Sequence, residues 1–303
     1  MRIYLAGLNE TALNGVERGS SNPNYEAVSG LVYPDMLESY HYIQKGQTVS
    51  NVRKRGEKIF LDSGAFSMFT QKVEVNLDAY AQFIHTNLDV IETASNLDHI
   101  GAGGEQKSYD NQKYLESLGV KIQPVHHARD TDNWLIKWLD EGYDYIFLGG
   151  MVPETTKYLT GWLDHIWAKY LTNPDGTARV KVHGFGLTTA DLMFRYPWYS
   201  VDSTSWVMTA AMGSIYLDLP HKDVKVCISN DSPKMKSQDL HYTTLSAVHK
   251  KVITDRIEEL GFSIENLQNM YGWRWRFNIE YFRRIANRGI TVFKHYPQRG
   301  LFD

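Results

Sequence analysis

The chain has 303 residues, of which 43% are hydrophobic and 22% charged, and its net charge is −3. Its 12 Phe, 8 Trp and 19 Tyr residues exclude global disorder, and its one cysteine, Cys227, excludes a disulfide framework and a cysteine-rich zinc site. A balance of 32 basic and 35 acidic residues excludes a uniformly basic surface for nucleic acid. Because no apolar run approaches the about 18 residues of a membrane span and no signal-peptide pattern is present, we expect a cytoplasmic protein that does not bind membranes.

Short apolar runs alternate with amphipathic stretches along the chain, as is typical of parallel strands joined by crossover helices. The length accommodates a barrel of about 250 residues with additions. The pattern therefore predicts an α/β protein with a TIM-type (β/α)8 barrel. The eight predicted strands are Ile3–Leu8, Lys58–Asp62, Val90–Asp98, Val120–His126, Tyr145–Gly149, Val180–Gly186, Tyr199–Asp202 and Ile290–His295.

Helical spacing of apolar residues marks the segments between these runs. In the first of them, Asn76 is a suitable N-terminal cap, and Gly119 and Gly142 are suitable stops for the second and third. The predicted helices are Asn76–Asn87, Tyr109–Leu118, Thr131–Glu141, Thr155–Tyr170 and Thr188–Tyr196.

The last third of the chain departs from a plain barrel. Ser214–Leu219 and Val224–Ile228 flank Pro220-His-Lys-Asp223, a pattern that predicts a β-hairpin after the seventh strand. We therefore expect a single barrel domain spanning residues 1–303, with a hairpin and loop insertion at 214–248. Helices and the last barrel strand are expected at 249–303.

Polar residues cluster where the predicted strands end, and in a parallel barrel these ends meet at one mouth. They include Asp62, Asp98, Asp202, the pair His126-His127 and the pair Gly149-Gly150. Three carboxylates without thiols can supply a nucleophile, a proton-transfer group and a hydrogen-bond acceptor for a polar ligand. A metal site is disfavoured, because adjacent residues on a strand such as His126 and His127 face opposite sides.

Five segments resemble the motifs of the tRNA-guanine transglycosylase family in order and spacing. They match five features of that family: the Asp-Ser-Gly motif, the Leu-Gly-Gly loop, the strand with the nucleophilic Asp, the strand after it and the C-terminal helix. The matching segments are Phe60-Leu-Asp-Ser-Gly-Ala-Phe-Ser67, Phe147-Leu-Gly-Gly-Met151, Tyr199-Ser-Val-Asp-Ser-Thr-Ser205, Gly213-Ser-Ile-Tyr-Leu217 and the helix-like Phe277–Ile290.

The chain also departs from that family. Cys227 alone cannot supply the family's zinc site of three cysteines and a histidine, so no zinc is expected, and the family's dimer is not implied. Where the family has the glutamine of a Val-Gln-Gly strand end, this chain has His126 after Val125. The arginine of the family's Pro-Thr-Arg turn is missing. The chain is more similar to the bacteriophage branch, which exchanges guanine in DNA for a 7-deazaguanine base. The resemblance thus implies DNA rather than tRNA, and the host cytoplasm if the protein is phage-encoded.

The resemblance implies a role for each matching residue. Asp202 would attack C1′ of a guanine nucleotide and form a covalent intermediate, while Asp62 would transfer the proton. The remaining matched residues would bind the base: Asp98 at N1–H and the 2-amino group, Gly149 and Gly150 at O6, His126 in place of the glutamine, Phe66 by stacking, and Ser63 beside it.

Local positive charge marks a predicted nucleic-acid interface. Residues 271–303 carry seven basic and two acidic side chains, and Arg274 and Arg276 alternate with aromatic residues there. Arg53 and Arg55 form a second cluster before the Asp62 strand. Three alternatives stay open: an enzyme acting on tRNA, an N-glycosidase or nucleoside hydrolase with water as acceptor, and an inert binding protein.

Overall fold

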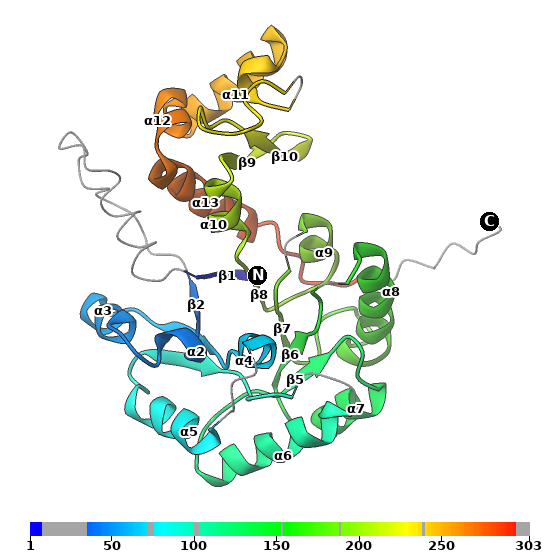
Figure 1. Cartoon of the computed structure of the whole chain (residues 1–303). Coiled ribbons are helices and arrows are strands. Elements are labelled where there is room, and N and C mark those ends of the chain that lie inside the picture. Colours follow the sequence, from blue (N-terminus) through cyan, green and yellow to red (C-terminus); the bar gives the residue numbers. More distant parts are fainter. Residues whose placement is uncertain are drawn as a thin grey trace. The chain divides into compact units, whose positions relative to one another are not determined.

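The computed structural model describes residues 1–7, 35–71, 76–99, 103–152, 154–187, 189–237 and 240–294 (Figure 1). The chain divides into two compact units. Among the described residues, the first unit comprises Met1–Ala6, 35–203 and 287–294, and the second comprises Gly7 and 204–286.

The first unit contains a sheet of eight parallel strands, in the order β4-β3-β2-β1-β8-β7-β6-β5. Neighbours in the chain are neighbours in the sheet except for β4 and β5, which lie at its two edges, and β1 also pairs with β8. The strands are β1 Arg2–Ala6, β2 Met36–Ser39, β3 Ile59–Asp62, β4 Ile91–Ala94, β5 Val125–His127, β6 Tyr145–Gly149, β7 Lys181–Gly184 and β8 Ser200–Ser203.

This sheet confirms the α/β class and the parallel strands but not a closed barrel. It is curled into a half-barrel with β4 and β5 at its edges, and one isolated parallel bridge, Ser95 to Gln123, joins the segments beside those edges. Phe60 on β3 and Phe147 on β6 belong to strands that are not neighbours, yet their ring centroids lie 4.9 Å apart. The curl therefore brings distant strands together across its inner face, as in TIM-like folds.

One predicted strand is wrong, and one strand was not predicted. Of the predicted last strand Ile290–His295, the described residues 290–294 lie outside the sheet, and only Val292 forms a bridge, antiparallel, to Thr177. The missing strand is β2, which occupies the place between β1 and β3. The sheet reaches eight strands through β2, so the segment after residue 249 contributes none of them.

Helices cover the outer face of the curled sheet, with α5, α6, α7 and α8 in succession around it (Figure 1). Their positions follow the predicted pattern, and the Asn76 side chain caps α5 by accepting a hydrogen bond from the Ala79 N–H at 2.9 Å. The helices of this unit are α2 Tyr40–Ile43, α3 Thr48–Arg55, α4 Ala65–Gln71, α5 Leu77–Thr86, α6 Gly104–Ser117, α7 Asp132–Asp140, α8 Thr156–Ile166, the π-helical turn Trp167–Leu171 and α9 Ala190–Arg195.

The inner face of the sheet is filled by alternate residues of its strands. They form one aromatic-rich cluster of Tyr4, Ala6, Leu37, Phe60, Val125, Tyr145 and Phe147, with Phe185 packed against it. Because side chains alternate along a strand, the residue two positions beyond each of these also faces inward. Asp62, two residues after Phe60, therefore also faces the inner side of the sheet.

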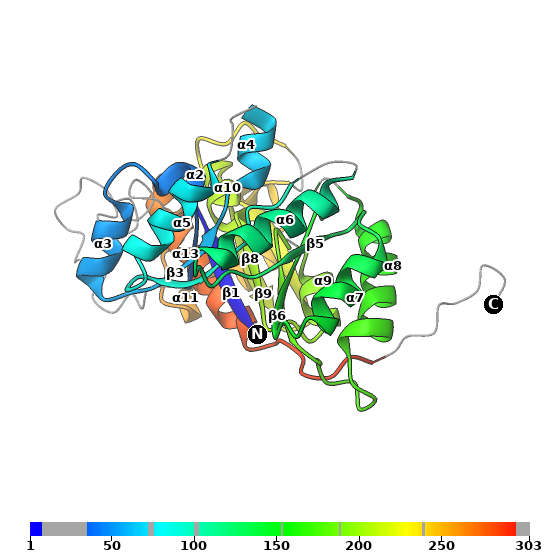
Figure 2. The same cartoon turned by 90° about the horizontal axis from the view of Figure 1, so that it is seen from below.

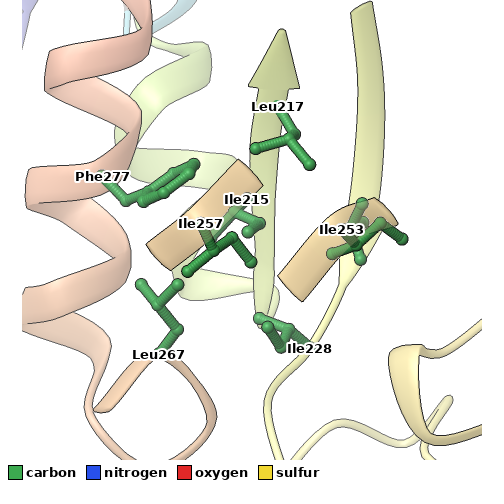
Figure 3. Packing of buried hydrophobic residues seen from close by; sticks show 8 residues of the cluster. Ile215, Leu217, Ile228, Ile253, Ile257, Leu267 and Phe277 are labelled. Carbon is green, nitrogen blue, oxygen red and sulfur yellow. The ribbon is translucent and has the colours of Figure 1, made fainter. Parts of the chain in front are cut away.

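The second unit has its own hydrophobic core (Figure 3). Its β9 Ser214–Leu219 and β10 Lys222–Cys227 form an antiparallel hairpin where the sequence pattern predicts one. Ile215 and Leu217 of β9 pack with Ile253 and Ile257 of α11 and with Phe277 of α13. The helices of this unit are α10 Ser205–Ala211, the 3-10 turn Tyr242–Thr244, α11 Ala247–Glu259, α12 Ile264–Asn269 and α13 Tyr271–Ala286.

Among the described residues, none of the helices has both the length and the hydropathy that crossing a membrane requires. In Figure 2 the strands of the first unit run upward, and α4 lies beyond the end to which they run. The candidate site is at this carboxyl end of the sheet.

Candidate active site

Three carboxylates meet at the carboxyl end of the sheet. Asp62 ends β3, Asp202 lies near the end of β8, and Asp98 follows β4 by four residues. Burial, and to a lesser extent the negative charges of Asp98 and Asp202, together raise the pKa of Asp62 from 3.8 to about 7. Asp62 therefore interacts electrostatically with both other carboxylates, and near neutral pH it is present in protonated and ionised forms.

The loop after β3 holds Asp62 in place through close backbone packing. The Gly64 N–H donates to Asp62 Oδ2 at 3.2 Å, and the Ser63 N–H donates to Ser95 Oγ at 2.8 Å. Gly64 has a φ of +80°, and a Cβ atom there would lie 2.5 Å from Ser39 Oγ. The Asp-Ser-Gly sequence thus needs its glycine, because the β2 segment leaves no space for a side chain.

His127, not His126, is the histidine of this site. Its Nε2 lies 2.7 Å from Asp98 Oδ2, and its Nδ1 lies 3.5 Å from Asp130 Oδ2. Burial alone lowers the pKa of His127, but hydrogen bonds to Asp130 and Asp98 outweigh it and raise the pKa from 6.5 to about 10. An imidazolium is therefore held between two carboxylates, and Asp98 is oriented by it.

His126 faces the other side of β5, and its Nδ1 lies 3.8 Å from Asp130 Oδ2, the oxygen that His127 Nδ1 also approaches. Its side chain is fully buried, and its ring stacks on that of Trp162 of α8 with centroids 6.2 Å apart. Burial lowers the pKa of His126 to about 4, so the ring is neutral at physiological pH. The prediction that His126 binds the base is wrong, because Val125 faces the inner side of the sheet and strand alternation then places His127 there too.

The two glycines of the Leu-Gly-Gly loop pack directly against His127. Gly149 is paired with His127 across β5 and β6, and a Cβ atom on it would lie 2.9 Å from His127 Cδ2. Gly150 is exposed, has a φ of +67°, and would place a Cβ atom 3.1 Å from His127 Cβ. The pair lets the imidazolium ring fit beside β6, and it leaves the Gly150 backbone accessible.

Asp202 is held by the loop after β7. Its Oδ1 accepts a hydrogen bond from the Gly186 N–H at 2.8 Å and lies 3.4 Å from His183 Nε2. No hydrogen bond from the described residues reaches Oδ2. The Asp202 side chain is 8% exposed, and its Oδ1 is fixed by the backbone of the loop.

The two remaining predicted base-binding residues differ in exposure. Phe66, on α4, is 57% exposed, so its ring is available for stacking. The Ser63 side chain is buried, and its Oγ accepts a hydrogen bond from the Ala65 N–H at the start of α4. Ser63 therefore has a structural role in placing α4 after Asp62.

The predicted basic interface needs a correction at Arg274. This residue is 6% exposed, and its guanidinium donates to the carbonyl oxygens of Ala210, Leu267 and Gln268. Arg274 therefore supports the second unit from inside and cannot contact phosphate, since its charge is directed into the protein.

The other three arginines of the predicted interface each have an internal partner. Arg276 is partly buried, with its guanidinium carbon 5.5 Å from the Trp273 ring centroid. The Arg53 guanidinium donates to Asp89, and the Arg55 Nε lies 3.0 Å from Glu57 Oε2. Their contact with nucleic acid stays a prediction.

Within the described part of the chain, no group of three or more His, Cys, Asp or Glu side chains is placed to hold a metal ion. Cys227 is buried in β10, and its Sγ lies 3.1 Å from Ser232 Oγ.

No protein-family model matches the chain, and no curated protein is significantly similar to it. The family resemblance therefore rests on the motifs alone, and the geometry of the carboxylate cluster is the independent ground for a functional proposal.

Proposed function

We propose that the protein is a transglycosylase that exchanges guanine in DNA for a 7-deazaguanine base. One observation supports this proposal most directly: at the carboxyl end of a TIM-like sheet, Asp98 and Asp202 act electrostatically on Asp62, and the three carboxylates differ in their surroundings. Asp62 has a pKa of about 7, Asp98 is bound to an imidazolium, and Asp202 has one oxygen fixed by a backbone N–H. These are the properties that an acid–base, a base-binding and a nucleophilic carboxylate need.

In this reaction Asp202 Oδ2 attacks C1′ of a guanine nucleotide, and the bond from C1′ to the base breaks. Asp62 in its protonated form gives its proton to the departing guanine. The ionised Asp62 then takes the N9 proton of the incoming 7-deazaguanine, whose nitrogen attacks C1′ and releases Asp202. Two displacements at C1′ retain its configuration, and no cofactor is required.

Recognition of guanine is the role proposed for Asp98. Its carboxylate accepts hydrogen bonds from N1–H and the 2-amino group, which adenine lacks in this arrangement. The bond from His127 to Oδ2 fixes the plane of the carboxylate, which then accepts from both donors of the base. The accessible Gly150 backbone is the proposed contact to O6.

A base inside a duplex cannot reach these groups, so the enzyme must take single strands or flip the nucleotide out. Phe66 is the proposed stacking partner of the flipped base, because its ring is exposed four residues after Asp62. Arg53, Arg55 and Arg276 remain the proposed phosphate contacts, and Arg274 is no longer one of them.

The direct test is a trapped intermediate. Wild-type protein incubated with guanine-containing DNA should give an adduct that survives a denaturing gel, and Asp202→Asn should abolish it. Asp140→Asn, which changes an exposed carboxylate at the end of α7, is the matched control and should leave the adduct intact. An adduct that persists in Asp202→Asn contradicts the assignment of the nucleophile.

A second experiment separates the alternatives. DNA and tRNA are incubated with labelled 7-deazaguanine, and their nucleosides are analysed by mass spectrometry. Label in DNA supports the proposal, and label in tRNA alone identifies the tRNA reaction. Abasic sites without label identify a hydrolase, and no change in either polymer identifies a binding protein.

A further inference from the structure

A line of polar side chains crosses the aromatic interior of the first unit and ends at Asp202. Tyr145 Oη on β6 lies 2.7 Å from Ser200 Oγ on β8, and Ser200 Oγ lies 2.8 Å from His183 Nδ1 on β7. The other ring nitrogen, His183 Nε2, lies 3.4 Å from Asp202 Oδ1. Ser200 and His183 are also register partners in the sheet, so the backbone fixes their separation.

The His183 ring lies in an apolar environment. The side chain is fully buried, and its ring packs against Phe60, Phe147 and Phe185 with centroids 4.4, 5.3 and 4.7 Å away. Nε2 has no hydrogen-bond partner among the described residues. An unpartnered buried nitrogen is costly, and in structures without substrate a catalytic hydrogen bond is often long and shortens when the substrate binds.

The hydrogen-bond inventory allows one consistent direction along this line. If Nε2 carries the proton, Nδ1 of a neutral ring must accept, and Ser200 must donate to it. Ser200 has one proton, so it must accept from Tyr145. Each group then donates toward Asp202, from the phenol to the hydroxyl, to the imidazole and to the carboxylate.

We propose that His183 is the positioning residue of Asp202: Tyr145 and Ser200 hold it as the neutral Nε2–H tautomer, and this N–H keeps Oδ1 in place so that Oδ2 faces the sugar carbon. This inference rests on the proposed function for its catalytic meaning, but the contact itself does not depend on that function. His183 touches no substrate and acts only through Asp202.

The charges around His183 agree with a neutral ring. Burial lowers the pKa of His183, while the Asp202 carboxylate opposes this effect without reversing it. The Phe60, Phe147 and Phe185 rings and the hydroxyl of Ser200 are uncharged. The Tyr4 ring, whose centroid lies 6.0 Å from that of His183, has a pKa that burial raises, so its phenol is also neutral, and Asp202 is the carboxylate beside the imidazole. A neutral imidazole can donate to a carboxylate without forming a buried ion pair.

The tautomer is tested by NMR on protein labelled with ¹⁵N-histidine, with His183→Gln identifying the His183 signals. Wild-type protein should show a protonated Nε2 and an unprotonated Nδ1. Ser200→Ala should broaden or shift Nδ1, and Asp202→Asn should move the Nε2 proton. A protonated Nδ1, or His183 signals that do not respond to Asp202→Asn, would overturn the proposal.

The functional consequence is tested with the trapped adduct. His183→Phe fills the aromatic site without a donor and should slow adduct formation about ten- to a hundredfold, as expected for a lost hydrogen bond to a charged group. Its affinity for free 7-deazaguanine should stay unchanged. His183→Gln, which restores an N–H donor, should recover part of the rate. Val182→Ala, a buried neighbour on the opposite side of β7, is the packing control and should keep the wild-type rate per folded molecule.

Each outcome bears on one claim. Equal slowing in His183→Phe and Val182→Ala would reduce His183 to a packing role and overturn the proposal. If His183→Phe does not fold, the rate of Ser200→Ala decides, because it changes the tautomer and removes only one oxygen. If wild-type protein forms no adduct, the proposed function fails, while the NMR response to Asp202→Asn still decides the His183 contact.

Discussion

The imidazolium of His127 should make the stability of the protein depend on pH in a defined window. Its pKa is about 10 in the folded protein against an ordinary 6.5. A group whose pKa is raised by folding stabilises the folded state fully below its unfolded pKa and loses that contribution as pH rises through the folded pKa. The stabilisation by His127 is therefore complete below about pH 6.5 and disappears toward pH 10.

The magnitude follows from the same two values. One pKa unit corresponds to about 1.36 kcal/mol, so the contribution is at most about 5 kcal/mol. The His127 side chain is 14% exposed, and its carboxylate partners Asp98 and Asp130 are 8% and 16% exposed, so water screens the pair little. We expect a measured loss of about 3–5 kcal/mol between pH 6.5 and 10.

The assay is urea unfolding of wild-type protein and His127→Gln at several pH values across that window. The difference in free energy of unfolding between the two should shrink as pH rises. The comparison removes contributions that both proteins share, such as Glu38, whose pKa burial raises to about 8. His126→Gln is the control: the pKa of His126 is about 4 in the folded protein and 6.5 in the unfolded chain, so its ring is neutral in both states above about pH 7.5. Its difference from wild type should therefore stay constant from there to pH 10.

A difference between wild type and His127→Gln that is the same at pH 6.5 and pH 10 would refute this reasoning. It would mean that His127 is neutral in the folded protein and that Asp98 is not oriented by a cation.

Three further predictions concern other parts of the site and its supports. Gly64→Ala should lower the free energy of unfolding by about 3 kcal/mol, because its Cβ would lie 2.5 Å from Ser39 Oγ at a φ of +80°; urea unfolding checks this, and a loss below about 1 kcal/mol would contradict it. Arg274→Met should destabilise the protein by about 2–3 kcal/mol, because buried carbonyl groups lose their donor, while the salt dependence of DNA binding stays the same. A reduced salt dependence would return Arg274 to the phosphate contacts. Asp62→Asn should remove an inflection near pH 7 from the rate of guanine release, and a wild-type profile flat from pH 6 to 8 would contradict the acid–base role of Asp62.

The pattern of apolar runs predicted most strands of the sheet correctly, and the two errors in the predicted strands have a physical origin. Seven of the eight predicted runs overlap strands of the sheet, because long apolar runs are needed where both faces of a strand are covered. β2 has the sequence Met-Leu-Glu-Ser, in which only two apolar residues are adjacent, and it was not predicted. Ile290–His295 has strand-like composition, but strand formation needs a partner edge, and β1 is already paired on both sides.

The sequence predicts those parts of the candidate site that depend on where an apolar run ends. It does not predict those that depend on the direction or the burial of a side chain. Asp62 and Asp202 were found because each ends an apolar run. The choice between His126 and His127 required knowing which face of β5 is inside. Arg274 looks like a phosphate contact among Trp273 and Trp275, yet its charge is directed to backbone carbonyl groups.

By itself, the sequence determined the α/β class, the parallel strands, the hairpin and the carboxylates at strand ends, because these follow from local periodicity and from where each apolar run stops. Only the tertiary structure decided which strands complete the sheet, which histidine contacts Asp98 and how Asp202 is held. Those features depend on groups from β5, β6, β7 and β8 that meet through packing, and neither their separation nor their burial is encoded in any one segment.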